Sequence, residues 1–196
     1  MKVLRVFVAV PVGNALLQGI LALQHRIATS LGGTNVRWTK PEQLHLTLRF
    51  LGNVTEHQVG DLSAALGRAC SGQVAFDIVV EGLGCFPSPQ QPRIVWVGIT
   101  EGAVALSQLA ERVRTETATF GDSTETKPLV PHLTIGRSKA VGAPSRRLGE
   151  LIEKASPGRI GTVKVSEVLL MRSELAHEGS CYTIIGREVL ADRATR

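Results

Sequence analysis

The spacing of apolar residues along the chain predicts one order of elements that occurs twice. In the first round, a β-branched strand at residues 3–10 precedes an amphipathic helix, and a strand region at 36–52, a second helix and a strand at 74–83 follow. In the second round, strand 93–100 precedes a helix, motif strand 130–138, helix 145–155 and strand 162–171. The apolar positions that define the helices are Leu16, Ile20, Leu23 and Ile27, then Leu62, Leu66 and Ala69, then Leu106, Leu109 and Val113.

The two rounds indicate an internal duplication. The chain closes with a hairpin-like pattern at residues 169–190, and its only proline-rich segment, residues 86–93, is typical of a loop between strands. Interleaved strands and helices with such hairpins predict an α+β protein with mostly antiparallel strands. We expect residues 1–196 to form one bilobal domain, because no linker separates the two rounds.

One tripeptide, His-Leu-Thr, occurs in both rounds, at residues 45–47 and 132–134. Side chains alternate between the two faces of a strand, so His45 and Thr47 are predicted to share one face, as are His132 and Thr134. If an approximate twofold axis relates the halves, two imidazoles and two hydroxyls face one cleft. A buried histidine bonded to a nearby hydroxyl would explain one such pair, but two equivalent pairs indicate a shared purpose.

Two opposed histidines suit an in-line displacement at phosphorus, in which one takes a proton from the attacking oxygen and the other gives a proton to the departing oxygen. An unperturbed imidazole titrates at about 6.5, so either residue can serve either role. The threonine hydroxyls can hold the non-bridging phosphate oxygens. No carboxylate cluster or third histidine stands at metal-ligand spacing, and we therefore expect chemistry without a metal or another cofactor.

The composition adds a basic balance to this picture. The chain of 196 residues carries a formal net charge of +5 with a pI near 9.5, which suits a polyanionic partner. No apolar run approaches the length of a membrane span, and the three cysteines form no C-x-x-C pair. We expect a cytoplasmic protein in a reducing compartment, not bound to membranes.

The paired HLTL and HLTI motifs on a duplicated α+β chain resemble the 2H phosphoesterase superfamily. The segments at residues 36–52, 82–99, 131–138 and 173–185 are similar, in order and spacing, to RNA 2',3'-cyclic phosphodiesterases, also called 2'-5' RNA ligases. The resemblance implies two antiparallel sheets flanking a central cleft with helices outside. It also implies metal-independent hydrolysis of a ribose 2',3'-cyclic phosphate to a 2'-phosphate, and a reverse reaction that joins RNA ends through a 2'-5' linkage.

The resemblance implies that His45 is the acid at the departing 3'-oxygen and His132 the base on water. Because the halves are pseudo-symmetric, a substrate bound in the flipped orientation would exchange the two roles. Five residues beyond these histidines stand Phe50 and Arg137, which could hold a nucleobase by stacking, while Arg137 could instead pair with phosphate. For Phe50 a place in the core is an equal alternative, since ideal alternation turns it away from His45.

Arg49 lies on the face of His45 on an ideal strand and is a predicted phosphate contact, with a solvated strand position as the alternative. The sequence departs from the family at Val130, where a basic residue often precedes the proline of the second motif.

Three functions remain open from the sequence. The first is hydrolysis of 2',3'-cyclic phosphates on RNA ends or nucleotides by a monomeric enzyme. The second makes 2'-5' ligation or cleavage the physiological direction, which product analysis would distinguish. The third is an RNA-binding module without turnover, in which binding would survive loss of either histidine.

Overall fold

The structure is a computed structural model, and it describes residues 2–32, 36–122, 129–155, 157–176 and 179–192. Nine strands and four helices lie within these ranges. The strands are β1 (Val3–Pro11), β2 (Val36–Trp38), β3 (His45–Thr55), β4 (Phe76–Phe86), β5 (Ile94–Ile99), β6 (His132–Ser138), β7 (Arg159–Val165), β8 (Glu167–Ala176) and β9 (Gly179–Val189). The helices are α1 (Asn14–Leu31), α2 (Val59–Cys70), α3 (Ala103–Glu116) and α4 (Ala143–Lys154), and short 3-10 turns occupy Pro41–Gln43 and Glu56–Gln58.

The strands form two sheets whose strand pairings are all antiparallel among the described residues. Sheet A has the order β3-β1-β8-β9, and sheet B has the order β2-β6-β5-β4-β7. The predicted α+β class is confirmed. The sheets do not coincide with the two halves of the sequence, because β8 from the second half joins the strands β1 and β3, and β4 from the first half joins β5 and β6.

Two regions predicted as continuous strands, 36–52 and 162–171, are each divided between the sheets. In the first, β2 ends at Trp38 in sheet B, and a 3-10 turn at Pro41–Gln43 leads to β3 in sheet A. In the second, β7 lies in sheet B and β8 in sheet A. The core residues are Val163 and Val165 in β7 but Val168 and Leu170 in β8, so the alternation changes phase where the chain changes sheets.

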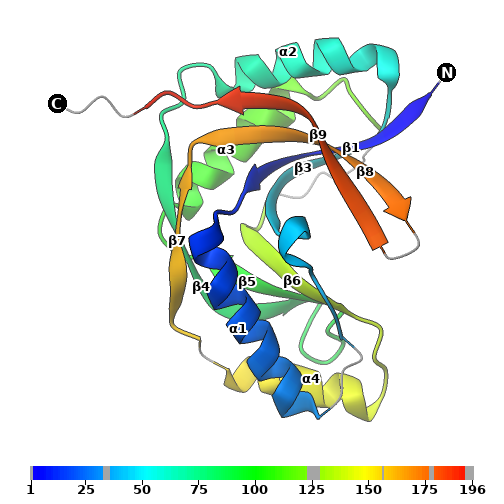
Figure 1. The fold of residues 1–196 in the computed structure, drawn as a ribbon, viewed down its shortest axis with the longest axis vertical. Helices are drawn as coiled ribbons and strands as arrows, with labels where there is room; N and C mark the ends of the chain where they lie inside the picture. Colours follow the sequence, from blue (N-terminus) through cyan, green and yellow to red (C-terminus); the bar gives the residue numbers. More distant parts are fainter. Residues whose placement is uncertain (1, 33–35, 123–128, 156, 177–178, 193–196) are drawn as a thin grey trace.

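Helices cover one face of each sheet, as Figure 1 shows. Helices α2 and α3 pack on sheet A, whereas α1 and α4 pack on sheet B. Their apolar sides join the leucines and valines of both sheets in one continuous core. No helix in the described part of the chain is long and apolar enough to cross a membrane.

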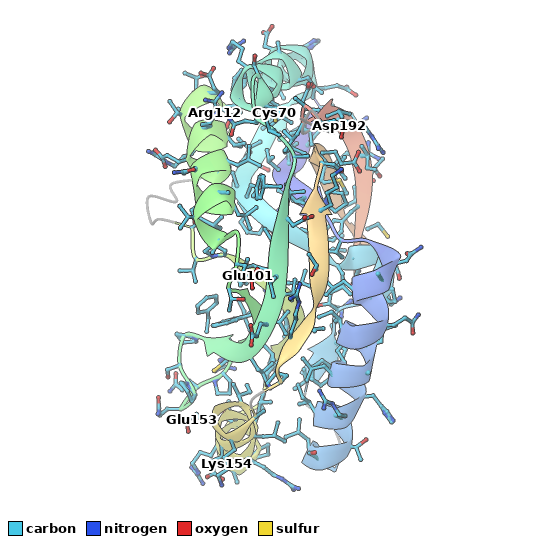
Figure 2. All side chains as sticks on the ribbon, turned by 90° about the vertical axis from the view of Figure 1, so that its left-hand side faces the viewer. Cys70, Glu101, Arg112, Glu153, Lys154 and Asp192 are labelled. Carbon is cyan, nitrogen blue, oxygen red and sulfur yellow. The ribbon has the colours of Figure 1, made fainter. Side chains whose placement is uncertain are left out.

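Arg112 of α3 caps the C-terminal end of the neighbouring helix α2. Figure 2 labels it next to Cys70, the last residue of α2. Its guanidinium donates to the carbonyls of Ala69 at 2.8 Å and Ser71 at 3.0 Å. The last carbonyls of a helix have no partner within the helix, and a basic side chain supplies one. Burial raises the pKa of the Cys70 thiol to about 11, so this cysteine is protonated at neutral pH.

A buried glutamine ties helix α1 to the segments that carry the two motifs. The side-chain amide of Gln24 donates to the backbone carbonyls of Thr39 and Ile135, each at 2.9 Å. The N–H of Thr39 also donates to the Ile135 carbonyl at 3.0 Å. Thr39 follows β2, where the chain leaves sheet B for sheet A, and Ile135 lies in β6. Gln24 therefore holds the start of this connection against the strand that carries the second motif.

Replacing Gln24 with leucine should lower the free energy of unfolding by about 1–3 kcal/mol, because the partly buried Thr39 carbonyl loses its side-chain donor and the Ile135 carbonyl loses one of its two donors. Urea unfolding would measure the change. The matched control is Gln18→Leu at an exposed position of the same helix, where we expect a change within about 0.5 kcal/mol. Equal stability of the Gln24 variant and the control would contradict this role.

Candidate active site

A one-residue bulge in β3 decides which of its side chains project together. Thr47 lies opposite Ala9 of β1 and Phe50 lies opposite Phe7, so two steps of β1 span three steps of β3. Because side chains alternate along β1, Thr47 and Phe50 project from the same face. The extra residue is Leu48, which is buried in the core. We call the face of sheet A that carries the motif histidine, opposite its helices, the inner face.

The second motif strand contains the same irregularity at the equivalent point. Thr134 of β6 lies opposite Trp96 of β5, and Arg137 lies opposite Ile94, with Ile135 as the extra residue. Thr134 and Arg137 therefore share one face of sheet B. This face carries His132 and lies opposite α1 and α4, and we call it the inner face of sheet B. In both halves, the bulge brings the fifth residue after the histidine to the face of the histidine.

The bulge also turns Arg49 away from that face. Arg49 lies opposite Val8, whose side chain is buried under the helices. Its guanidinium donates to the carbonyl of Arg114 at 2.8 Å and to the hydroxyl of Thr117 at 2.5 Å. The structure thus does not bring Arg49 to the histidines. The prediction assumed ideal alternation, and the actual position ties β3 to the end of α3.

Phe50 has an exposed ring on the inner face of sheet A. Its side chain is 47% exposed, and its ring centroid lies 6.1 Å from that of Phe7. Since Phe7 in turn contacts the ring of His45, Phe50 borders the motif histidine. An ideal strand would have placed Phe50 in the core, so the bulge decides between the two alternatives.

Both histidines are held by the same hydrogen bond. Nδ1 of His45 lies 2.7 Å from the carbonyl oxygen of Gln43, and Nδ1 of His132 lies 2.7 Å from that of Val130. A carbonyl oxygen only accepts hydrogen bonds, so Nδ1 must be the protonated nitrogen in each neutral ring. Nε2 then keeps its lone pair for a substrate, or holds the exchangeable proton in the imidazolium.

Aromatic rings enclose His45 on sheet A. The Phe7 ring lies 4.8 Å away by centroid, and Tyr182 of β9 meets the imidazole edge-on at 5.2 Å. The segment before the histidine is anchored as well, because the Gln43 side chain donates to the carbonyl of Ser180 at 2.6 Å. The aromatic contacts hold the imidazole of His45 directly, and the Gln43 hydrogen bond holds the backbone that precedes it.

His132 has an equivalent aromatic surrounding on sheet B. The Phe86 ring meets it edge-on at 5.0 Å, and the Trp96 ring lies 6.2 Å away. The Trp96 indole lies across Gly84, where a Cβ atom would come within 2.3 Å of the ring. Gly84 therefore provides the space in which Trp96 can lie beside the histidine.

A positive charge on the inner face of sheet B acts on the motif histidine of sheet A. Burial lowers the pKa of His45 below its usual 6.5, the hydrogen bond to the Gln43 carbonyl opposes this, and the positive charge of Arg137 lowers the pKa further. Arg137 belongs to sheet B and His45 to sheet A, and the motif strands β3 of sheet A and β6 of sheet B contact each other where the two sheets meet (Figure 1). The two motif strands thus lie close enough for a charge of one half to act on the histidine of the other.

Several residues around the histidines were not identified as site residues from the sequence. Phe7, Phe86, Trp96 and Tyr182 are recognised only once the strand pairing is known. Gln43 carried a possible signal, since it stands two residues before a motif histidine. That spacing becomes meaningful only when the equivalent carbonyl of Val130 is seen to make the same bond.

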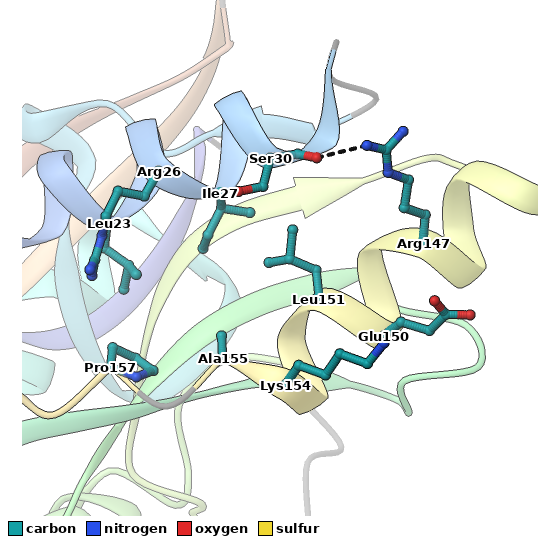
Figure 3. A pocket seen from close by; sticks show the side chains of 10 residues that line it. All are labelled: Leu23, Arg26, Ile27, Ser30, Arg147, Glu150, Leu151, Lys154, Ala155 and Pro157. Carbon is teal, nitrogen blue, oxygen red and sulfur yellow. Dashed lines mark hydrogen bonds between the residues drawn. The ribbon is translucent and has the colours of Figure 1, made fainter.

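A pocket of about 510 Å³ lies elsewhere, between α1 and α4. Figure 3 shows its apolar floor of Leu23, Ile27 and Leu151, and the hydrogen bond at its rim from Arg147 to the Ser30 carbonyl. It contains no histidine and is covered by neither motif strand, so it is not the site of the motif chemistry. Within the described residues, no three His, Cys, Asp or Glu side chains gather as metal ligands would.

Comparison with known proteins identifies the fold and the family. The chain matches the family described as LigT like phosphoesterase twice, over residues 10–96 and 97–182. The chain belongs to the LigT like phosphoesterase family. The two matches agree with the duplication predicted from the sequence, and each contains one motif histidine, His45 or His132.

Relatives in this LigT like family include two RNA 2',3'-cyclic phosphodiesterases. That of Aquifex aeolicus is 32% identical over 94% of this chain and 96% of its own, and that of Methanothermobacter thermautotrophicus is 35% identical over 93% and 96%. Among solved structures, TT0787 of Thermus thermophilus superposes with a TM-score of 0.80 at 27% identity, covering 96% of this chain and 98% of its own. Escherichia coli LigT complexed with 3'-AMP gives 0.76 at 26% identity, covering 96% and 99%.

Replacing Arg137 with alanine should raise the pKa of His45, because a nearby positive charge disfavours the imidazolium. The pH titration of the His45 imidazole, followed by NMR, would measure the shift. The matched control is Arg146→Ala, which removes the same charge from the exposed surface of α4 and should leave the titration unchanged. A His45 pKa that stays constant or falls in the Arg137 variant would contradict the opposed arrangement of the two faces.

Proposed function

We propose that this LigT like phosphoesterase hydrolyses ribose 2',3'-cyclic phosphates at RNA ends to 2'-phosphates. The observation that carries the proposal is the pair of histidines, each fixed by the same Nδ1 hydrogen bond and each offering Nε2 from an inner face. The relatives named RNA 2',3'-cyclic phosphodiesterase support the same substrate. Two nitrogens of this kind meet the demand of an in-line displacement for one base and one acid.

In the proposed step, neutral His132 accepts a proton at Nε2 from a water molecule whose oxygen attacks phosphorus. The P–O3' bond breaks as the new P–O bond forms, and protonated His45 donates its Nε2 proton to the departing O3'. The product is a 2'-phosphate, and the two histidines end with exchanged protonation. The lowered pKa of His45 makes its imidazolium a stronger proton donor, while the anionic phosphate favours the protonated form when substrate is bound.

The other inner-face residues have proposed binding roles. Thr47 and Thr134 project beside the histidines and would donate their hydroxyl protons to non-bridging phosphate oxygens. Phe50 would stack on a nucleobase, since its exposed ring borders His45. Arg137 would pair with a phosphate of the bound RNA, because its charge already acts on His45.

We expect one working unit that needs no metal. Residues 1–196 would act as one bilobal domain, which the continuous core supports. We expect a monomer that acts in the cytoplasm on RNA ends. A single unfolding transition would test the one-domain arrangement, and the mass in solution would test the monomeric state.

The test of function is turnover, in EDTA, of an RNA oligonucleotide that ends in a 2',3'-cyclic phosphate. The parent protein should release a 2'-phosphate, and His45→Ala and His132→Ala should each lower kcat by about 10² to 10⁴. Mass spectrometry and nuclease mapping would locate the phosphate. His25→Ala on the exposed side of α1 is the control and should keep full activity.

Three outcomes would contradict the proposal in different ways. No turnover by the parent would leave the RNA-binding module as the better account. A 3'-phosphate product would place bond cleavage at the other oxygen. Efficient joining of RNA ends through 2'-5' linkages, with little hydrolysis, would favour ligation as the direction of the reaction.

A further inference from the structure

Arg37 occupies a position on the inner face of sheet B that neither the motif nor the proposed reaction explains. It is the central residue of the edge strand β2, and it pairs directly with Arg137 of β6. Its neighbours Val36 and Trp38 turn the other way, because both approach the position where Gly136 would carry a Cβ atom, within 2.9 Å. Strand alternation therefore directs Arg37 to the face of Arg137.

The two guanidinium groups form a basic pair beside the reaction site. Directly opposite residues of an antiparallel pair have Cα atoms about 4.5–5.5 Å apart, so one phosphate can be reached by both side chains. A phosphate between the two arginines would make charge-assisted interactions with both, for which planar guanidinium groups are well suited. Both side chains belong to exposed residues, so a polyanion can reach them.

The pair lies at a suitable distance from the reacting phosphate. Thr134 and Arg137 lie opposite Trp96 and Ile94, two steps of β5 or about 7 Å apart, and Arg37 lies one strand farther toward the edge of the sheet. Thr134 is the proposed contact of the reacting phosphate. The basic pair thus leads away from the site, in the direction of β2, as a longer substrate would require.

We infer that Arg37, together with Arg137, binds the phosphodiester that joins the last two nucleotides of an RNA ending in a 2',3'-cyclic phosphate. The inference rests on the proposed function and narrows it. The preferred substrate is an oligonucleotide, because a nucleoside 2',3'-cyclic phosphate has no second phosphate for Arg37 to bind. Arg37 is thus a determinant of substrate length.

The experiment compares Arg37→Ala with the parent on two substrates, a nucleoside 2',3'-cyclic phosphate and the dinucleotide that ends in the same group. For the dinucleotide, kcat/KM should fall roughly tenfold, as expected for loss of a charged hydrogen bond. For the mononucleotide it should stay unchanged, which also shows that the variant is folded. The slope of log kcat/KM against log salt should become shallower by about 0.7 for the dinucleotide only.

Two further variants sharpen the comparison. Arg37→Lys keeps the charge and should recover part of the dinucleotide activity, whereas Arg146→Ala removes an equal charge from α4 and should affect neither substrate. An equal loss on both substrates, or no loss on either, would overturn the role of Arg37 while leaving the proposed function intact. Failure of the parent on both substrates would instead overturn the proposed function.

Discussion

The hydrogen bond from a histidine Nδ1 to the carbonyl two residues earlier is the constraint on which the site depends. It occurs twice, at 2.7 Å in both halves, with Gln43 and Val130 as the acceptors. Each bond fixes the tautomer and the rotation of the ring, so that Nε2 is the only nitrogen left for proton transfer. The acceptor is a backbone carbonyl, which every residue has, so the polar Gln43 and the apolar Val130 can both accept this hydrogen bond.

The two halves are alike in geometry but differ in environment. His45 is enclosed by Phe7 and Tyr182, and its anchoring residue Gln43 is tied to β9, whereas His132 follows an exposed Val130. Enclosure lowers the pKa of His45. A duplicated chain could thus give its two equivalent histidines different roles, although the motifs themselves are nearly identical.

The sequence allowed prediction of the features that depend on local pattern. The four helices, most of the strands and the shared face of each His and Thr follow from periodicity and alternation, and the repeated motif pointed to the two histidines. The bulges at Leu48 and Ile135 could not be predicted, because they are set by pairing with strands distant in the sequence. They reverse the alternation beyond the motif, which moves Arg49 to the helices and Phe50 to the inner face.

The exchange of strands between the halves is a second feature that local pattern hides. The turn at Pro41–Gln43 and the phase change near Ser166 each carry the chain from sheet B to sheet A, yet the apolar residues on both sides of each crossing make the region resemble a single strand. The first crossing has a consequence for the site, because it places Arg37 in sheet B and His45 in sheet A only eight positions later. The same segment thus contributes to both inner faces.

The most direct test of the paired mechanism is hydrolysis of a cyclic phosphate in which sulfur replaces the 3'-oxygen. A thiolate departs without protonation, so only the variant that lacks the acid should recover. The account predicts that His45→Ala approaches the parent rate on this substrate while His132→Ala remains impaired. Recovery of His132→Ala alone would reverse the two roles, and recovery of both variants or of neither would contradict an acid and a base acting on opposite sides of one phosphate.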